Sequence, residues 1–406
     1  MDSKETAGPV QALDGIRVLD CATFIAGPYC AAMFAEFGAE VIKVELPGAG
    51  DPLRKFGTMT GCGDTLNWLS ESRNKKSVTL DLRKPEGAAL FKDLVAKSDV
   101  VVENFQTGTL ERWGLGYDEL KKVNPGIVLV RITGYGQTGP YANRPGFGRI
   151  ANAFGGLSFL AGFPDRPPVT PGSATLPDYL SGMYGIIGAL VALQARERTG
   201  EGQVVDIGLY ESVFRILDEV AAAYKFKGFV RQRMGPGTVN AVPHSHYPTK
   251  DTRWVAIACT SDKIFERLAQ VMGRADVTSG GKYSTTAQRE AARDEVDAFV
   301  AEWTGRHTRD EVLAACEQGQ VPCGIVAAID EIFGNEQYAA RENIRTVDHP
   351  GSGEISVPNV VPRLTGTPGA IRWLGPKLGS HNDEIYRGLL GLTAERIAEL
   401  KAKGAV

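Results

Sequence analysis

The N-terminal part of the chain alternates short apolar runs with helical patterns. Apolar strands are expected at 16–21 (IRVLDC), 41–45 (VIKVE), 77–82 (SVTLDL), 99–105 (DVVVENF) and 127–136 (IVLVRITGYG). Between them lie helical stretches, of which AGPYCAAMFAEFGAE is the first and TLERWGLGYDELKKVN the last. Strands that are apolar throughout and alternate with helices form parallel sheets that are covered on both faces. The pattern therefore predicts an α/β fold with a Rossmann-like open parallel sheet.

The rest of the chain predicts a second, smaller domain. Gly and Pro crowd into residues 134–172, which predicts a long irregular stretch before an apolar helix that ends at Gly200. A second loop-rich stretch at 230–250 precedes the apolar run WVAIAC, which begins an α+β pattern. A chain of 406 residues exceeds what one hydrophobic core usually supports. We expect a large domain at 1–225, a small α+β domain at 226–330, and a helical C-terminal segment at 331–406 that returns to the large domain.

Composition excludes several classes of protein. The formal net charge is -3, and the basic residues are scattered, so nucleic acid is not an expected partner. No apolar run has signal-peptide or membrane-spanning length, so we expect a cytoplasmic protein without membrane contact. The six cysteines lie far apart without CxxC spacing, which favours reduced thiols over a zinc site or disulfides.

Asp178 is the first candidate for chemistry. It follows Pro177 where the apolar helix begins, and backbone amides at a helix start favour an ionised carboxylate. Taken alone, this position is explained more simply by a helix cap. A nucleophilic carboxylate has the same needs, namely ionisation, a rigid support and a cover that keeps out bulk water.

Other polar residues follow the predicted strands. Only Gly27 of a GxGxxG pattern follows the first strand, which counts against a dinucleotide cradle. Asn104 and Phe105 end the fourth expected strand, where an amide could bind a ligand and a ring could stack on it. Arg83 and Arg112 could pair with phosphates, although each taken alone is explained as a surface charge. HExxH and GxSxG patterns are absent, so neither a metalloprotease nor a nucleophile-elbow hydrolase is expected.

Several segments together resemble one family. They are LDGIRVLDCATFIAGP, GAEVIKVELPGAGDPLR, NKKSVTLDLRKPEG, VVENFQTGTLERWGLGYDELKKVNP, ITGYGQTGPYANRPGFG, TLPDYLSGMYG, ARERTGEGQVVDIGLYES, VPCG and PKLGSHNDEI. In this order they resemble the class III CoA-transferases, also called the formyl-CoA transferase and carnitine CoA-transferase family, which also contains α-methylacyl-CoA racemase. The resemblance runs nearly from end to end.

The resemblance implies a fold and a set of site residues. It implies a Rossmann-like large domain from both chain ends, a small domain between them, and an obligate homodimer of interlocked protomers. The family's catalytic aspartate corresponds to Asp178. Residues expected to line the CoA cleft are Phe24, Ile25, Leu46, Leu80, Arg83, Asn104, Phe105, Arg112 and Tyr135. Two of them depart from formyl-CoA transferase, because Ile25 replaces a glutamine and Leu46 replaces an arginine.

The resemblance also implies a covalent mechanism. Asp178 would form an acyl anhydride and then an aspartyl-CoA thioester, with CoA as co-substrate and with no metal, ATP or permanently bound cofactor. The Gln137 side chain or backbone amides could stabilise the oxyanion. A glycine-rich loop at 234–237 could serve as a lid against water.

For the substrates, the resemblance implies short dicarboxylic acids, with succinyl-CoA as donor and malate, citramalate or a related acid as acceptor. A distal carboxylate needs a cation or donor pair, for which Arg54, Arg149, His244 and His246 are candidates by chemistry. Three alternatives stay open: intramolecular CoA transfer within one dicarboxylic acid, α-methylacyl-CoA racemisation, and non-catalytic acyl-CoA binding with Asp178 as a cap. The racemase pairs its aspartate with a histidine, and Phe147 stands at that position, which disfavours two-base proton exchange.

Overall fold

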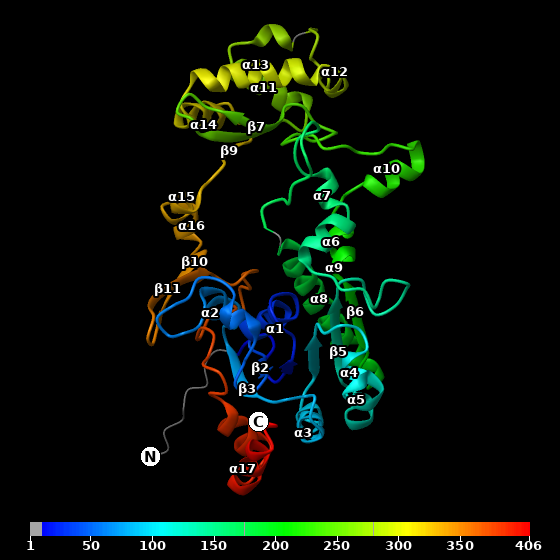
Figure 1. Cartoon of the computed structure of the whole chain (residues 1–406). Coiled ribbons are helices and arrows are strands. Elements are labelled where there is room, and N and C mark those ends of the chain that lie inside the picture. Colours follow the sequence, from blue (N-terminus) through cyan, green and yellow to red (C-terminus); the bar gives the residue numbers. More distant parts are fainter. Residues whose placement is uncertain (1–9, 174, 279) are drawn as a thin grey trace. The chain divides into compact units, whose positions relative to one another are not determined.

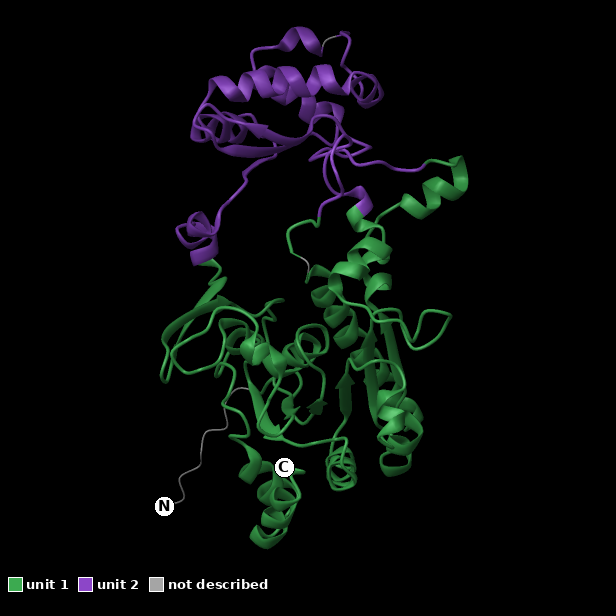
Figure 2. Cartoon of the chain, viewed as in Figure 1, with its two compact units in different colours: residues 1–158, 170–229, 340–406 green, residues 159–169, 230–339 purple. Residues whose placement is uncertain are grey.

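The computed structural model describes residues 10–173, 175–278 and 280–406, and the chain forms two compact units (Figure 2). The first unit comprises the described residues up to Ser158 together with Thr170–Phe229 and Ala340–Val406. The second unit comprises Phe159–Val169 and Val230–Ala339. The domain limits expected from the sequence, after residues 225 and 330, stay predictions.

A six-stranded parallel sheet forms the centre of the first unit, with the order β3-β2-β1-β4-β5-β6 (Figure 1). Its strands are β1 (Arg17–Asp20), β2 (Glu40–Glu45), β3 (Lys75–Thr79), β4 (Val100–Glu103), β5 (Val128–Thr133) and β6 (Val204–Gly208). The chain runs outward from β1 to β3, then returns to place β4 beside β1 and runs outward to β6. The predicted open parallel sheet is therefore confirmed, with a topological switch point between β1 and β4.

Helices cover both faces of this sheet. Successive side chains of a strand point to opposite faces, and the strands contribute to two separate cores. One core contains α3 (Pro85–Val95) and α17 (Ala394–Ala402). The other contains α1 (Ala26–Glu36) and α8 (Leu176–Thr199). Burial on both faces explains why these strands are apolar at nearly every position.

Small residues bring α8 against α1. A Cβ atom at Gly182 would lie 2.8 Å from the carbonyl oxygen of Ala26, so only glycine allows this approach. In the described chain α8 is the one helix whose length and apolar composition would suffice to cross a membrane. Its buried side packs on α1 and β5, which is the arrangement of a core helix.

Two stretches differ from the helices expected from the sequence. Residues 109–124 form two short helices, α4 (Thr109–Arg112) and α5 (Tyr117–Val123), because Gly114 between them has a φ of 68° that helices do not allow. Within the C-terminal segment, expected to be helical, β10 (Ile344–His349) and β11 (Gly353–Pro358) form an antiparallel hairpin. Gly351 between the strands and Gly353 at the start of β11 both have a positive φ and favour that turn.

Further helices of the first unit connect or flank the sheet strands. They are α2 (Leu66–Glu71), α6 (Gly148–Phe154), α9 (Leu209–Arg215), α10 (Val220–Lys227) and a π-helical turn at Glu384–Leu389. The short α7 (Leu157–Leu160) lies where the chain passes from the first unit to the second.

The second unit contains an antiparallel sheet with the order β7-β8-β9. Its strands are β7 (His244–Pro248), β8 (Trp254–Ala258) and β9 (Cys323–Ile325). Its helices are α11 (Asp262–Val271), α12 (Thr286–Ala291), α13 (Arg293–Arg306), α14 (Arg309–Gln318), α15 (Ile329–Phe333) and α16 (Glu336–Ala340). The three strands and the helices α11, α13 and α14 share one core, which contains Phe265, Val300 and Cys316.

Candidate active site

Asp178 lies within the first turn of α8 and does not cap it. The N-cap of α8 is Thr175, whose carbonyl oxygen accepts a hydrogen bond from the Asp178 backbone N–H at 3.0 Å. The Asp178 side chain is partly buried and makes no ion pair among the described residues. Burial removes water from its carboxylate and raises the pKa of Asp178 to about 6, against a smaller lowering by its own backbone N–H. The carboxylate is thus available to a ligand.

Asp178 lines a cavity of about 320 Å³. Its wall is formed by the segments that directly follow β1, β4 and β5, with Leu209 from α9. These segments lie at the carboxyl ends of the strands on both sides of the switch point. Ligands of open α/β sheets bind at this edge.

The turn after β1 is held by side chains from two other segments. The Asn104 amide donates to the Thr23 carbonyl oxygen and accepts from the Thr23 N–H, each at 2.7 Å. Phe24 has a φ of 61°, a left-handed conformation that costs a bulky residue about 1–3 kcal/mol. Its N–H donates to Asp51 Oδ1 at 3.1 Å. Asn104 therefore orders the cavity wall in addition to lining it.

A network of buried charged side chains lies next to the turn after β1. Asp51 Oδ2 lies 2.8 Å from Lys43 Nζ, and Asp20 Oδ2 lies 2.8 Å from Lys75 Nζ. Lys43 also lies 3.5 Å from Asp20 Oδ1, which joins the two pairs. All four side chains are almost completely buried, and a buried charge that loses its partner is strongly destabilising. The network makes the turn after β1 rigid.

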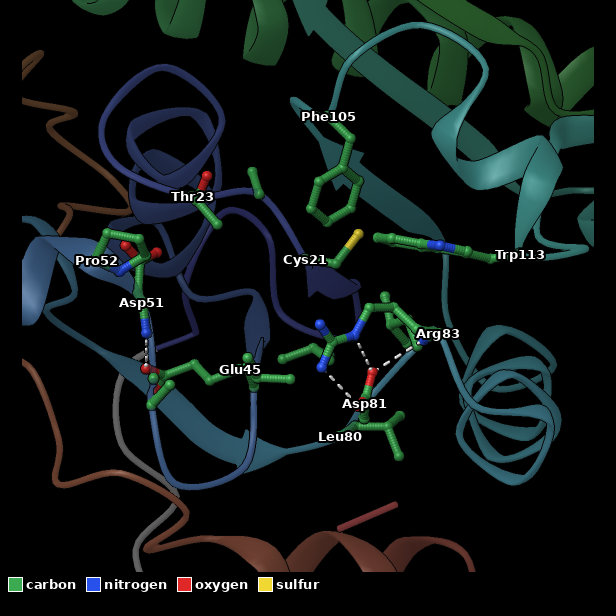
Figure 3. A pocket seen from close by; sticks show the side chains of 16 residues that line it. Cys21, Thr23, Glu45, Asp51, Pro52, Leu80, Asp81, Arg83, Phe105 and Trp113 are labelled. Atoms are coloured by element: carbon green, nitrogen blue, oxygen red, sulfur yellow. Dashed lines mark hydrogen bonds and ion pairs between the residues drawn. The ribbon is translucent and has the colours of Figure 1, made fainter. Parts of the chain in front are cut away.

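A second cavity, of about 450 Å³, lies at the carboxyl ends of β1, β2 and β3 (Figure 3). The Phe105 and Trp113 rings pack edge to face with centroids 5.1 Å apart on its wall. Arg83 reaches the same cavity and pairs with Asp81 at 2.8 Å. An aromatic wall beside a largely exposed guanidinium suits a ligand with a ring and a phosphate.

Thr23 and Phe105 line both cavities. The two cavities are therefore neighbours. Of the nine residues expected to line a CoA cleft, six line one or both cavities: Phe24, Leu46, Leu80, Arg83, Asn104 and Phe105. Their contact with CoA stays a prediction.

The other three expected cleft residues lie outside these two cavities. Ile25 is buried in a cluster with Leu53 and Trp68. Arg112 donates to Thr109 Oγ1 at 2.7 Å, and Tyr135 packs in an aromatic cluster with its ring centroid 5.3 Å from that of Phe154. Their roles in binding CoA likewise stay predictions.

The residues suggested for the substrate acid lie in different places. Arg54 is buried, and its N–H groups are all engaged by Glu45, Asp64 and the Pro376 carbonyl oxygen at 2.7–3.0 Å. Arg54 thus serves the packing of the unit. The exposed Arg149 donates to Thr170 Oγ1 at 3.4 Å.

The other residues suggested for binding or catalysis are His244, His246 and Gln137. His244 and His246 lie on β7 of the second unit. Gln137 donates its backbone N–H to Asp206, and its side-chain amide is buried without a hydrogen-bond partner. Their proposed roles stay predictions.

Sequence reasoning did not single out Trp113, Asp51 or Arg144. Arg144 lies in the Gly/Pro-rich loop after β5 and lines the Asp178 cavity. A cation in a loop at the carboxyl end of a parallel strand is a signal that could have identified it. Asp51 follows β2 by a few residues, and nothing local marks its long-range contact with Phe24.

The fold is a doubly wound α/β sheet with two neighbouring cavities at the carboxyl ends of its strands, one of them lined by a single carboxylate, Asp178. Residues 13–382 match the model of the family described as CoA-transferase family III. The chain belongs to this family and is a CoA-transferase.

Four known protein chains illustrate the relationship. The chain is similar to both subunits of a succinyl-CoA–L-malate CoA-transferase from Chloroflexus aurantiacus, at 53% identity to alpha (96% of this chain, 92% of that one) and 52% to beta (all of both chains). A succinyl-CoA–D-citramalate CoA-transferase from the same organism is 46% identical over 98% of this chain and 99% of its own. The crystal structure of a CAIB/BAIF family protein from Brucella suis has a TM-score of 0.82 and 33% identity, covering 93% of this chain and 99% of that one.

Proposed function

We propose that this protein transfers CoA from succinyl-CoA, or from another short dicarboxyl-CoA, to malate, citramalate or a related acid. The observation that carries this proposal is the 52–53% identity, along nearly the whole chain, to the two subunits of a succinyl-CoA–L-malate CoA-transferase. The relative that acts on D-citramalate supports the same class of acceptor.

Asp178 is the proposed nucleophile. Its carboxylate attacks the thioester carbonyl carbon of the donor, the C–S bond breaks, and a mixed anhydride and CoA thiolate result. The thiolate then attacks the aspartyl carbonyl and releases the donor acid, which leaves an aspartyl-CoA thioester. The acceptor carboxylate reverses these steps, so that a new acyl-CoA forms and Asp178 is regenerated. The acyl bond stays activated throughout, and no ATP is consumed.

The environment of Asp178 supports this role. A carboxylate stripped of part of its water is a stronger nucleophile, and a pKa of about 6 still leaves Asp178 mainly ionised at pH 7. No other side chain occupies its oxygens through an ion pair in the described part of the chain. The cavity admits an acyl group and limits the water that would hydrolyse the anhydride.

The two neighbouring cavities support an orientation for CoA. We place the nucleotide in the cavity with Arg83, Phe105 and Trp113, and the thioester in the cavity with Asp178. The pantetheine arm passes Thr23 and Phe105, which line both.

The side chains of the Asp178 cavity disfavour racemisation. Phe147, at the position of the racemase histidine, lines this cavity and is 70% exposed. Asp178 and Arg144 are the only charged residues among the described lining residues, and an arginine stays protonated. A second base for exchanging an α-proton is therefore missing from this lining. Intramolecular transfer would use the same aspartate and is distinguished by labelled acceptor acid.

We propose further that the active form is a homodimer in the cytoplasm. The chain is about equally similar to the alpha and the beta subunit of the succinyl-CoA–L-malate CoA-transferase. This supports a dimer in which two copies of one chain take the positions of the two subunits. On α8, Ile187 and Val191 are 54% and 65% exposed, and Phe226 on α10 is 84% exposed. Such apolar side chains are typical of a subunit interface. The cysteines are all free, as in a reducing compartment.

The decisive experiment combines trapping with turnover. Incubation with succinyl-CoA and hydroxylamine is expected to place a hydroxamate on Asp178, located by peptide mass spectrometry. Asp178→Ala is expected to lower kcat by about 10⁴-fold or more while CoA still binds. Normal turnover by Asp178→Ala would refute the proposed chemistry. Transfer to monocarboxylic acids alone would refute the proposed substrates.

A further inference from the structure

The loop between β5 and α6 carries Arg144 into the Asp178 cavity. Gly134 and Gly146, at the two ends of this loop, cross back to back, since a Cβ atom on Gly134 would lie 2.8 Å from the Gly146 Cα. Both glycines and Arg144 line the cavity. The crossing fixes the end of the loop only two residues from Arg144.

The Arg144 side chain is supported but not neutralised. Its guanidinium lies over the Tyr141 ring, 3.5 Å from the centroid, and its backbone N–H donates to the Tyr141 carbonyl oxygen at 2.8 Å. Among the described residues it makes no ion pair and no side-chain hydrogen bond. Stacking on one face of a guanidinium leaves its N–H groups, which lie in the plane, free to bind a carboxylate in two places.

The charges in the cavity need a cation. A dicarboxyl acyl group would bring a second carboxylate close to ionised Asp178, and two like charges in one partly buried cavity repel each other. Arg144 is the only cation among the described lining residues of this cavity. Arg54, a candidate by chemistry alone, has no free N–H group.

We propose that Arg144 binds the distal carboxylate of the acyl group and so selects dicarboxylic over monocarboxylic substrates. The inference rests on the proposed function, because it concerns the acid that this site accepts. Arg144 acts in both half-reactions, since donor and acceptor each present a second carboxylate when their other end reaches Asp178.

The test compares two acyl groups that differ by one carboxylate. In an Asp178→Asn background, which blocks turnover, the dissociation constants of succinyl-CoA and butyryl-CoA are measured by calorimetry with and without Arg144→Met. Loss of a charged hydrogen-bonded pair is expected to weaken succinyl-CoA about 10- to 100-fold and to leave butyryl-CoA within about twofold. Arg144→Lys is expected to recover part of the loss, since it restores the charge without the fork.

A matched control and three outcomes make the test decisive. Arg198→Met removes an exposed arginine near the other end of α8, about 30 Å along the helix from Asp178, and is expected to change neither affinity. Equal weakening of both thioesters would show that Arg144 contacts CoA and would overturn the inference. Unchanged binding of both, or a selective loss from Arg149→Met in place of Arg144→Met, would overturn it as well.

Binding and turnover separate this inference from the proposed function. If the unsubstituted enzyme fails to move CoA from succinyl-CoA to any dicarboxylic acid, the proposed function is wrong. If it does so while Arg144→Met binds both thioesters normally, only the role of Arg144 is wrong. Should Arg144→Met not fold, Arg144→Gln, which has a shorter, uncharged and polar side chain, is measured in its place.

Discussion

The Phe24 backbone N–H donates a hydrogen bond to the Asp51 carboxylate across the end of β1, at 3.1 Å. Asp51 is itself fixed by Lys43, 2.8 Å away. A residue from a distant turn thus holds Phe24 in a conformation that its side chain would otherwise avoid. The wall of the Asp178 cavity is therefore pre-organised before a ligand binds.

Asp51 and Phe24 are expected to be energetically coupled. Asp51→Ala removes the acceptor of the Phe24 N–H, so the strained turn can relax and the cavity wall can move. The expected fall in kcat/KM is about 5- to 100-fold, since the strain at Phe24 is about 1–3 kcal/mol. Asp51→Asn keeps an acceptor for the N–H and should cost less. In a Phe24→Gly background the left-handed turn needs no support, so Asp51→Ala should cost clearly less there. A double-mutant cycle on kcat/KM checks this, and additive effects would contradict the coupling.

The first half-reaction should depend on the protonation of Asp178. Only the carboxylate attacks a thioester, so single-turnover rates with succinyl-CoA should fall about tenfold per pH unit below an apparent pKa of about 6. Above pH 7 they should be constant. The measurement is hydroxamate formation in rapid-quench experiments between pH 5 and 8. If the rate instead began to fall only near pH 4, the Asp178 carboxyl would be solvated as in water, and its pKa would not be raised.

Asp178 should also weaken the fold at neutral pH. A carboxyl whose pKa is raised in the folded state resists ionisation there, so Asp178→Asn should stabilise the protein above pH 6. The gain is expected to be about 1 to 2 kcal/mol, after allowance for the water that reaches a half-buried group. It should be mostly lost by pH 4, where the folded chain holds the proton and an unfolded Asp, with its ordinary pKa of 3.8, is only about half ionised. Urea unfolding at pH 8 and pH 4 tests the sign, and equal gains at both would contradict it.

Gly134 should tolerate no side chain. Gly134→Ala forces a Cβ against the Gly146 backbone, which moves the loop that carries Arg144. We expect kcat/KM for succinyl-CoA to fall at least about tenfold with little change in stability, because the loop lies at the surface. Gly305→Ala serves as control, since nothing lies within 4 Å of its Cβ position. Unchanged kcat/KM in Gly134→Ala would mean that the loop absorbs the shift.

Arg54 should matter for stability and not for the choice of acid. Arg54→Met leaves Glu45 and Asp64 buried without their partner, which is expected to cost about 3–5 kcal/mol. Among molecules that remain folded, the ratio of activities with dicarboxylic and monocarboxylic donors should not change. A selective loss of dicarboxylic activity would return Arg54 to the substrate site.

The sheet was predictable because its strands carry a purely local signal. Uninterrupted apolar runs between helical patterns indicate buried parallel strands, and five of the six strands were located in this way. β6 was missed because its sequence, VVDIG, places Asp206 in a short run. The hairpin formed by β10 and β11 was missed because most of its residues are exposed and give no apolar period.

The candidate site was predictable only in part, and for physical reasons. Asp178 and the residues that directly follow strands could be found, since topology brings the carboxyl ends of parallel strands together. The full engagement of Arg54 by Glu45 and Asp64, and the freedom of Arg144, depend on contacts between distant segments. A sequence shows that a residue is charged, but not whether another residue has already neutralised that charge.

The back-to-back crossing of Gly134 and Gly146 has a consequence for the evolution of this enzyme. The two glycines fix both ends of the loop between β5 and α6. The residues between them could therefore change while the ends of the loop stay in place. In the proposed orientation the nucleotide lies on the other side of the switch point, so a change of this loop would leave the proposed nucleotide-binding residues unaltered. Substitutions confined to this one loop could in this way change the acid that the enzyme accepts.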